Sequence, residues 1–330
     1  MTIGWGIVGI GNIANRAIAP HVQELSESEL VGVVSRDAGR AEEFRSRHAA
    51  RRAHTALDDL LADPEVQVVA VTTPNALHPD QVIAAARAGK HVLCDKPLAL
   101  TPSDAERVRE ECRKAGVTLG INFQTRHHAC FQEARRLIAE GELGDVILVQ
   151  VEVSAGAAPL RGWRTDPGLA GMGSVNNIGV HAYDLLRYLL DAEVSTVATL
   201  TDVGRRDELE TLALTVFRFA NGTMAYVNAN QATPNQQSDI DIYGTRGRIV
   251  GHGITRPWQE GEMRVLTESG ERVTQETTQD CYRRLIDDFN HAVLEGREPL
   301  ASGLDGVRSV QLVDAMAHSA REGRTVELES

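Results

Sequence analysis

The sequence predicts an α/β domain followed by an α+β domain with a large, mostly antiparallel open sheet. Up to about residue 121, short apolar runs alternate with helical patterns, which is typical of a doubly wound parallel sheet. Beyond residue 122, alternating strands follow one another, and Asn221-Gly222 between two of them is a strong hairpin turn. A chain of 330 residues is long enough for two such domains.

We therefore expect a first domain over 1–121 and a second over 122–330, with the last helix, about 304–322, packing back on the first. In the first domain we expect strands at 3–8, 30–34, 66–71, 91–94 and 117–120, and helices at 14–25, 41–48, 56–61, 79–88 and 103–115. In the second we expect helices at 130–140, 175–190, 282–295 and 304–322, and strands at 146–153, 194–200, 212–219, 223–229, 238–243, 248–250, 263–267 and 272–277.

The composition excludes several classes of protein. The net charge is −12, and the densest basic run, Arg45 to Arg52, holds only four arginines and one histidine, so no nucleic-acid partner is expected. No apolar run is long enough to span a bilayer, so no membrane partner is expected either. With no signal peptide pattern and four scattered cysteines, we expect reduced thiols and a cytoplasmic location.

The first strand runs into a glycine-rich turn, Gly9-Ile10-Gly11-Asn12-Ile13-Ala14. Gly9 permits the tight turn, and Gly11 leaves room for a pyrophosphate to approach the backbone. Ala14 is small where the following helix packs on the strand. The helix amino terminus then offers N–H groups to phosphate. Between a strand and a helix, this motif predicts a dinucleotide-binding Rossmann domain.

The end of the second strand indicates which dinucleotide is bound. A carboxylate there accepts from the ribose of NAD, whereas a nearby arginine accommodates the 2′-phosphate of NADP. Ser35 occupies this position, followed by Arg36 and, one helical turn on, Arg40. NADP(H) is therefore the preferred cofactor. In the alternative, Asp37 binds the ribose of NAD(H) and the arginines are ordinary surface residues.

One lysine stands out in an arginine-rich chain. Of the 34 basic residues only Lys90, Lys96 and Lys114 are lysines. Lys96 follows the strand 91–94, and ligands bind beyond the carboxyl ends of such strands. Lysine, unlike arginine, shifts its pKa when it is desolvated. A solvated loop lysine is the alternative.

A second cluster lies on the helix predicted over 175–190. Asn177, His181, Asp184 and Tyr188 share one face at spacings of four, three and four. His181 could donate or accept a proton there. In the alternative, this polar line merely faces water. No metal is expected, because the histidine and cysteine pairs at 91–94 and 127–130 lack a partner set at zinc spacing.

Five segments together resemble the glucose–fructose oxidoreductase / inositol dehydrogenase / rhizopine-catabolism (Gfo/Idh/MocA) family over nearly the whole chain. They are Gly-Ile-Gly-Asn-Ile-Ala at 9–14, Thr-Pro-Asn-x-x-His at 73–78, Ala-Gly-Lys-His-Val-x-Cys-Asp-Lys-Pro at 88–97, Gly-Trp-Arg at 162–164 and Gly-Val-His-x-x-Asp at 179–184. The resemblance implies a catalytic lysine, aspartate and histidine. Lys96 and His181 match two of them, and Asn177 stands where the family usually has aspartate.

The resemblance also implies the rest of the site. Asn122, Arg126 and Trp163 would line the substrate pocket with the catalytic set. The cofactor-binding residues would be Gly9, Gly11, Asn12, Ile13, Ser35, Arg36, Arg40, Thr73, Pro74, Asn75, His78, Asp95, Lys96, Trp163 and Arg164.

The implied activity is hydride transfer between NADP(H) and a carbonyl or secondary alcohol of a sugar, keto-sugar or polyol, in a homo-oligomer that is a dimer or tetramer. Because Asn177 supplies no negative charge, we expect His181 to be a weaker base and a better acid, which suits carbonyl reduction. Two alternatives stay open: a nicotinamide-binding sensor or scaffold without turnover, and an NAD-dependent glycosidase on a related fold. The Ser35-Arg36 pair and the retained Lys96 and His181 argue against the glycosidase.

Overall fold

The computed structural model describes residues 2–156, 160–202, 209–234, 237–258, 260–277 and 280–328. They form two compact units. The first comprises Met1–Gln124 and Tyr282–Val310, and the second Thr125–Cys281 and Gln311–Ser330. The boundary predicted at residue 121 differs from these units at residues 122–124 and 282–310. Each unit is described by itself.

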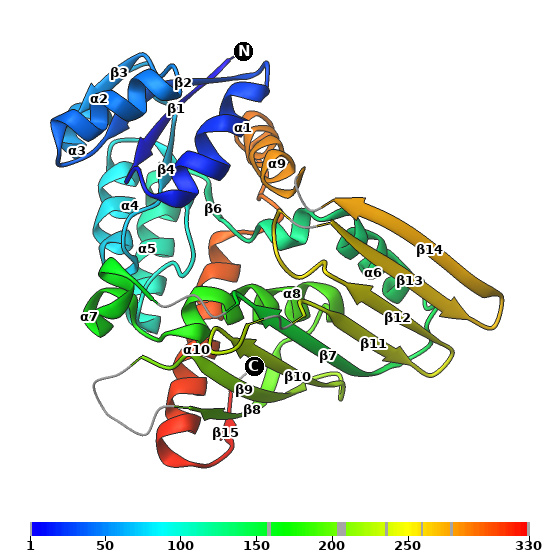
Figure 1. Cartoon of the computed structure of the whole chain (residues 1–330). Helices are drawn as coiled ribbons and strands as arrows, with labels where there is room; N and C mark the ends of the chain where they lie inside the picture. The colour runs from blue at the N-terminus through cyan, green and yellow to red at the C-terminus, as the bar shows by residue number, and fades with distance from the viewer. Residues whose placement is uncertain are drawn as a thin grey trace. The chain divides into compact units, whose positions relative to one another are not determined.

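The first unit is built on a six-stranded parallel sheet with the order β3-β2-β1-β4-β5-β6 (Figure 1). Its strands are β1 (Ile3–Val8), β2 (Ser28–Val34), β3 (Arg52–His54), β4 (Val68–Val71), β5 (His91–Cys94) and β6 (Leu119–Ile121). This order is that of a dinucleotide-binding domain, in which the order of the strands reverses between β1 and β4 while all of them stay parallel. The predicted doubly wound sheet is confirmed.

The central strands are apolar because both faces of the sheet are covered. Every residue of β1 and β4 is buried. The covering helices are α1 (Ala19–Glu24), α2 (Ala38–Arg47), α3 (Leu57–Leu61), α4 (His78–Arg87) and α5 (Pro102–Ala115). The edge strand β3 was not predicted, since its sequence Arg-Ala-His is short and polar. The strand that precedes Lys96 is therefore the fifth along the chain and not, as expected, the fourth.

The carboxyl-terminal part of the chain contributes to the first unit through α9 (Cys281–Glu295) and the start of α10 (Gly303–Glu322). The ring centroids of Trp5 and Phe289 lie 5.8 Å apart, and Trp5 Nε1 donates to Asn290 Oδ1 at 3.1 Å. The amide of Ile121 donates to the carbonyl of Ala301 at 2.9 Å. These contacts join α9 to β1, and the segment before α10 to β6.

The second unit contains a nine-stranded sheet with the order β14-β13-β12-β11-β7-β10-β9-β8-β15, in which only β10 and β7 pair in parallel. Its strands are β7 (Val146–Ser154), β8 (Val194–Thr201), β9 (Leu212–Phe219), β10 (Met224–Asn230), β11 (Ile240–Gly244), β12 (Gly247–His252), β13 (Glu260–Thr267), β14 (Gly270–Thr277) and β15 (Val326–Glu327). The mostly antiparallel sheet is confirmed, and Asn221-Gly222 forms the predicted turn, with Gly222 at φ +89°.

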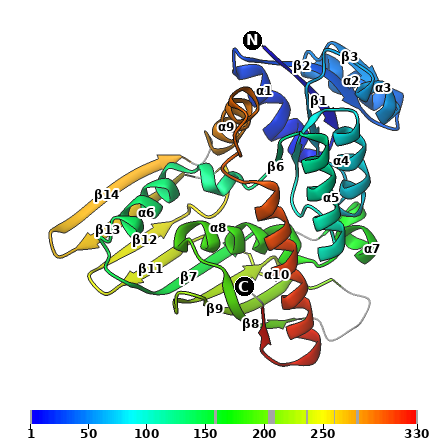
Figure 2. The same cartoon turned by 180° about the vertical axis from the view of Figure 1, so that it is seen from behind.

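Two helices, α6 (Ala129–Ala139) and α8 (Val180–Leu190), lie against one face of this sheet (Figure 2). The short segments η3 (Gln124–His127), η4 (Gly162–Thr165) and α7 (Pro167–Ala170) complete the connections. In β9, buried and outward-facing residues alternate along the strand, with every second side chain inward. The other face of the sheet therefore carries its own set of side chains.

Two helices that follow predicted site segments begin with π-helical turns. These are η1 (Ala14–Ile18), before α1, and η5 (Val175–Gly179), before α8. A single 3₁₀ turn, η2 (Asn75–Leu77), precedes α4. One π turn lies directly after the glycine turn and the other within the second predicted cluster.

Within the described residues, no helix combines the length and the apolar composition that a membrane crossing requires.

Candidate functional site

The glycine turn after β1 has the shape that a dinucleotide needs. Gly9 has φ +90°, and a Cβ there would lie 2.7 Å from Thr73 Cγ2 and 2.9 Å from the backbone of Thr72. A Cβ at Gly11 would meet no heavy atom within 4 Å. Gly9 is thus required by the fold, whereas the open space at Gly11 fits the close approach of a pyrophosphate. Asn12 is exposed and Ile13 half-buried at the start of the following helix.

The end of β2 places two arginines at the surface. Arg36 and Arg40 are exposed, and the structure shows no ion pair for either guanidinium in the described part of the chain. Asp37 begins α2, where its Oδ1 accepts the amide of Arg40 at 3.0 Å. Ser35 Oγ accepts the amide of Asp37 at 3.4 Å. One carboxylate oxygen of Asp37 is therefore used as a helix cap, and the arginines remain available to an anion.

The segment after β4 is hydrogen-bonded to the loops that follow the two neighbouring strands, β1 and β5. Thr72 Oγ1 donates to the carbonyl of Gly9 at 2.5 Å. His78 is fully buried, with Nε2 at 2.9 Å from the carbonyl of Thr73 and Nδ1 at 2.8 Å from that of Pro97. Its ring thus joins the β4 and β5 loops from within the protein, while Thr73 and Pro74 are partly exposed and Asn75 is buried.

Lys96 lies at the carboxyl end of β5, as the sequence predicts. It is half-buried, and the Lys96–Pro97 peptide is cis. Asp95 Oδ1 accepts the amide of Lys96 at 2.9 Å and Asn122 Nδ2 at 3.1 Å. Asn122 is only 2% exposed, and its contact with Asp95 fixes the backbone from which Lys96 projects. Asp95 therefore orients the Lys96 loop through its carboxylate.

In the second unit, Asn177 is the centre of a hydrogen-bonded chain. Arg164 Nε donates to Asn177 Oδ1 at 3.3 Å, and Asn177 Nδ2 donates to Gln231 Oε1 at 2.5 Å. The guanidinium of Arg164 stacks on the Trp163 ring at 4.3 Å. Because both atoms of its amide are used, Asn177 connects the 162–164 loop to the end of β10. His181 lies half-buried in the first turn of α8.

The rest of the predicted polar line does not face water. Asp184 is fully buried, and its two oxygens accept from Arg126 at 2.8 and 2.6 Å. Tyr188 is 6% exposed, its ring lies under the guanidinium of Arg126, and burial raises the pKa of its hydroxyl. The alternative of a solvated helix face is thus wrong for these residues. Arg126, expected to contact substrate, is held by Asp184 in the described structure.

Lys90, another of the lysines, has a structural role. Its Nζ donates to the carbonyls of Asp63 at 2.9 Å and Val66 at 2.7 Å, and burial lowers its pKa. All four cysteines are free and buried. Among the described residues no group of three or more histidine, cysteine or acidic side chains could hold a metal ion.

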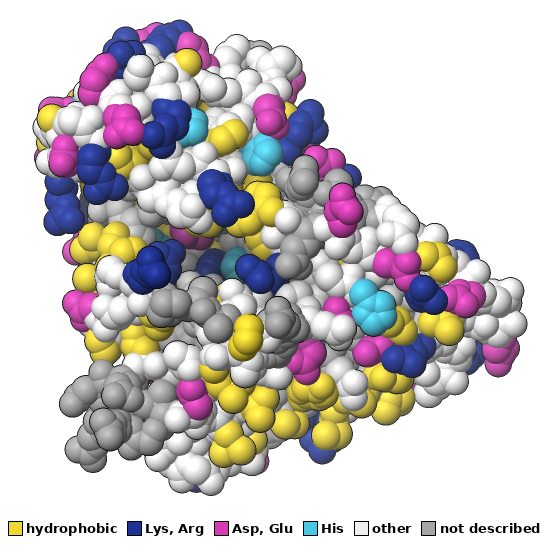
Figure 3. All heavy atoms as spheres, viewed as in Figure 1, with side chains coloured by type: hydrophobic (Ala, Val, Ile, Leu, Met, Phe, Trp, Pro, Cys, Tyr) yellow, Lys and Arg dark blue, Asp and Glu magenta, His cyan; other side chains and the backbone are white. Residues whose placement is uncertain are grey.

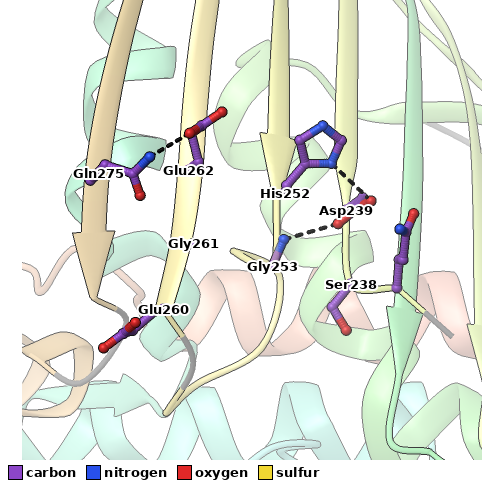
Figure 4. A pocket seen from close by; sticks show the side chains of 9 residues that line it. Ser238, Asp239, His252, Gly253, Glu260, Gly261, Glu262 and Gln275 are labelled. Carbon is purple, nitrogen blue, oxygen red and sulfur yellow. Dashed lines mark hydrogen bonds and ion pairs between the residues drawn. The ribbon is translucent and has the colours of Figure 1, made fainter. Parts of the chain in front are cut away.

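A surface pocket of about 640 Å³ lies on the sheet of the second unit (Figure 4). It is lined by Gln237, Ser238, Asp239, His252, Gly253, Glu260, Gly261, Glu262 and Gln275. In it, His252 Nδ1 lies 3.1 Å from Asp239 Oδ2, and Gln275 contacts Glu262. None of the predicted site residues lines this pocket, so it is separate from the two clusters described above.

The predicted residues thus form two groups. One group lies at the carboxyl ends of the strands of the first unit and contains Lys96. The other surrounds Asn177 and His181 in the second unit. Two residues of the second group were missed: Gln231, which bonds Asn177, and Glu210, whose carboxylate accepts the amides of Gly173 and Val175. Neither lies in a periodic pattern or a motif, because both act through contacts that are distant in sequence.

The comparisons with known proteins agree with this architecture. A family described as "Oxidoreductase family, NAD-binding Rossmann fold" matches residues 3–123, and the "GFO/IDH/MocA C-terminal domain" matches residues 131–250. The chain is 31% identical to 1,5-anhydro-D-fructose reductase of Ensifer adhaerens, over 99% of this chain and 98% of that protein. It is 34% identical to D-xylose 1-dehydrogenase (NADP(+)) 2 of Haloferax volcanii, over 98% and 99% of the two chains.

A solved structure shows the same likeness. The aldose-aldose oxidoreductase from Caulobacter crescentus, complexed with glycerol, superposes with a TM-score of 0.92 at 30% identity, over 99% of this chain and 100% of that one. Fold and motifs together define an oxidoreductase with a nicotinamide-dinucleotide-binding domain. More narrowly, the chain belongs to the Gfo/Idh/MocA family of oxidoreductases.

Proposed function

We propose that this protein is an NADP(H)-dependent oxidoreductase that reduces a carbonyl, or oxidises a secondary alcohol, of a sugar, keto-sugar or polyol. The observation that carries this proposal is Lys96, half-buried at the carboxyl end of β5 in a sheet whose glycine turn fits a dinucleotide. The substrate class is supported by the names of two relatives, 1,5-anhydro-D-fructose reductase and D-xylose 1-dehydrogenase (NADP(+)) 2.

The cofactor would be held by residues of the first unit. The N–H groups after Gly9 and the space beside Gly11 would accept the pyrophosphate. Pro74, Asn75 and His78 would belong to the segment beside the nicotinamide ribose. When bound, the nicotinamide supplies the hydride, and the protein orients the reactants and manages the proton.

The proton would pass through His181. In reduction, His181 would donate a proton to the substrate oxygen, while the ammonium of Lys96 polarises that oxygen and stabilises its developing negative charge. Asn177 would hold Arg164 and the Trp163 loop beside the substrate through the contacts described above. Because the amide is neutral, it does not add a negative charge that would stabilise a protonated His181.

The preference for NADP(H) rests on Arg36 and Arg40. Both are exposed at the end of β2, and no ion pair to a carboxylate neutralises either of them among the described residues. A 2′-phosphate carries up to two negative charges, and each charge-assisted hydrogen bond to it is worth roughly 1.5–3 kcal/mol. The double variant R36A/R40A should therefore lose at least about tenfold in affinity for NADPH, and affinity for NADH should change little.

The experiment that tests the proposed function is a screen of sugars, keto-sugars and polyols in both directions with both cofactors. Turnover of at least one keto-sugar with NADPH, faster than with NADH, is the expected result. Binding of NADPH without turnover of any substrate would favour the sensor or scaffold. Cofactor that stays bound through gel filtration, together with glycoside hydrolysis, would favour the glycosidase.

We further propose that the enzyme is a homo-oligomer that assembles through the outer face of its nine-stranded sheet. Apolar side chains gather on this face (Figure 3). The strand register places Leu200, Leu214, Val216, Met224, Leu266 and Val273 outward, and each of them is between 37% and 69% exposed. An exposed apolar face of this kind marks an interaction site.

The assembly can be tested by light scattering coupled to gel filtration. Val216→Glu should lower the mass toward that of a single 35.9 kDa chain. Leu77→Glu, at an apolar residue of the first unit that is 41% exposed, is the matched control and should leave the mass unchanged. A wild-type protein that elutes as a monomer would refute this part of the proposal.

A further inference from the structure

We propose that Glu210 is a positioning residue that fixes the start of the helix carrying Asn177 and His181. This inference deepens the proposed function and rests on it where it concerns turnover. The contacts of Glu210 themselves stand on the structure alone.

Glu210 receives three consecutive backbone amides. Its Oε2 accepts the amide of Gly173 at 2.9 Å, and its Oε1 accepts that of Val175 at 3.0 Å. Its backbone carbonyl accepts the amide of Ser174 at 2.8 Å. The approach is close, because a Cβ at Gly173 would lie 2.0 Å from the carbonyl oxygen of Glu210. Residue 210 therefore holds the segment 173–175, where the helix begins, through three hydrogen bonds.

These amides need an acceptor from elsewhere. The first N–H groups of a helix have no partner within it. Ser174, at the cap position of η5, makes no side-chain cap hydrogen bond. The carboxylate of Glu210, which is only 5% exposed, supplies the missing acceptors and places negative charge at the positive end of the helix.

The same segment also holds the partner of Asn177. The carbonyl of Thr211 accepts the amide of Gln231 at 2.7 Å, and Gln231 Oε1 accepts from Asn177 Nδ2. In addition, the amide of Asn177 donates to the carbonyl of Gly173 at 2.9 Å. A displacement of residues 210 and 211 would thus move Asn177 both through its backbone and through its side chain.

Protonation of Glu210 would weaken its hydrogen bonds to residues 173 and 175. Burial raises the pKa of Glu210, and the negative charge of Asp202, at the end of β8, raises it further. The backbone amides that donate to the carboxylate, those of Gly173 and Val175 among them, act in the opposite direction and lower this pKa. A proton on the carboxyl group turns one acceptor oxygen into a donor, so one of the two amides loses its partner.

The consequence is an acidic limb in the pH profile of carbonyl reduction. His181 is needed in its acid form for reduction, so its titration lowers the rate only toward high pH. A loss of rate toward low pH, starting above the ordinary carboxyl range, would report the protonation of Glu210.

The test compares Glu210→Gln with Asp202→Asn. The glutamine keeps the shape of the side chain but can accept only one of the two amides. Its kcat should fall roughly 10- to 100-fold, since a misplacement of about 1 Å can cost that much. The KM for NADPH should not change, and the acidic limb should disappear. In D202N, Asn Oδ1 can still accept the amides of Thr211 and Leu212, so the plateau kcat is kept and the limb moves to lower pH.

A second readout does not depend on turnover. Hydrogen exchange of the amides of residues 173–175, measured by mass spectrometry without substrate, should be faster in E210Q than in the wild type and in D202N. If E210Q does not fold, Glu210→Asp replaces it. This variant keeps the charge but is one methylene too short for both amides, so it should keep the acidic limb at a reduced kcat.

Two results in a folded E210Q would overturn the inference. One is amide hydrogen exchange at residues 173–175 that is no faster than in the wild type, and the other is a pH profile of kcat that keeps its acidic limb. If the wild type reduces no keto-sugar, the proposed function fails. The exchange measurement then still decides whether Glu210 holds the helix.

Discussion

The buried ion pair between Arg126 and Asp184 should be one of the most sensitive points of the second unit. The exposed fractions of the two side chains are 6% and 0%, and two hydrogen bonds of 2.8 and 2.6 Å join them. In Asp184→Asn, Arg126 stays charged, and the amide group of the new side chain places N–H donors against the guanidinium. Breaking a buried pair in this way costs about 3–5 kcal/mol.

The assay is thermal unfolding, followed by calorimetry and circular dichroism. For domains of this size, each kcal/mol shifts Tm by about 2–4 °C, so D184N should unfold at least about 6 °C below the wild type. The control is Asp191→Asn, at the carboxyl-terminal cap of the same helix. Its pair with Arg135 is 36% and 85% exposed, and an exposed pair is worth about 0–1 kcal/mol.

A Tm of D184N within a degree or two of that of D191N would refute this account of the pair. The double variant R126M/D184L removes both charges and should recover much of the loss, because a buried pair can often be replaced by apolar side chains. The same variants also test the predicted substrate contact of Arg126. If Arg126 binds substrate, the double variant should show a raised KM even where its stability is restored.

Three further predictions follow from the structure. Gly9→Ala should destabilise the fold, because of its positive φ and its contacts below 3 Å, whereas Gly11→Ala should keep the wild-type Tm and bind NADPH at least about tenfold more weakly; equal Tm values would contradict this. Burial lowers the pKa of His91, whose Nδ1 accepts the backbone amide of Thr118. Because the histidine is then protonated more readily in the unfolded chain than in the folded protein, stability should fall as the pH drops below about 6.5. His91→Gln should flatten this part of the curve of stability against pH, and an unchanged slope would contradict the prediction. Asn177→Asp adds a negative charge that stabilises a protonated His181, so the pH profiles of reduction and oxidation should both move to higher pH; unchanged profiles in both directions would sink the role given to Asn177.

Local sequence was enough for the framework of this protein. The glycine turn from Gly9 to Ala14 lies between a strand and a helix, and the apolar runs of β1, β4 and β5 end where the sheet order requires. These features are short-range, since a turn, a strand and a helix start are each specified by neighbouring residues. The position of Lys96 at a strand end follows from the same reasoning.

The contacts that organise the second cluster are long-range, and no periodic pattern contains them. Spacing placed Asp184 and Tyr188 on one line with Asn177, but it could not show that Arg126 buries Asp184, 58 residues away in sequence. The π-helical turn η5 also changes the spacing that an α-helix would give between residues 177 and 181. Gln231 and Glu210 are linked to this cluster by hydrogen bonds to residues that are distant in sequence, which a local pattern does not contain.

The proposed function requires that Lys96 and His181 both act on the substrate oxygen. The most direct measurement is the rate of keto-sugar reduction by NADPH in K96A, H181A and the double variant, with the Kd for NADPH measured alongside. Each single change should lower kcat at least about 100-fold, the double variant should lose much less than the product of the two, and the Kd should stay within about threefold. Near-normal kcat in K96A, or losses that multiply fully in the double variant, would contradict the claim.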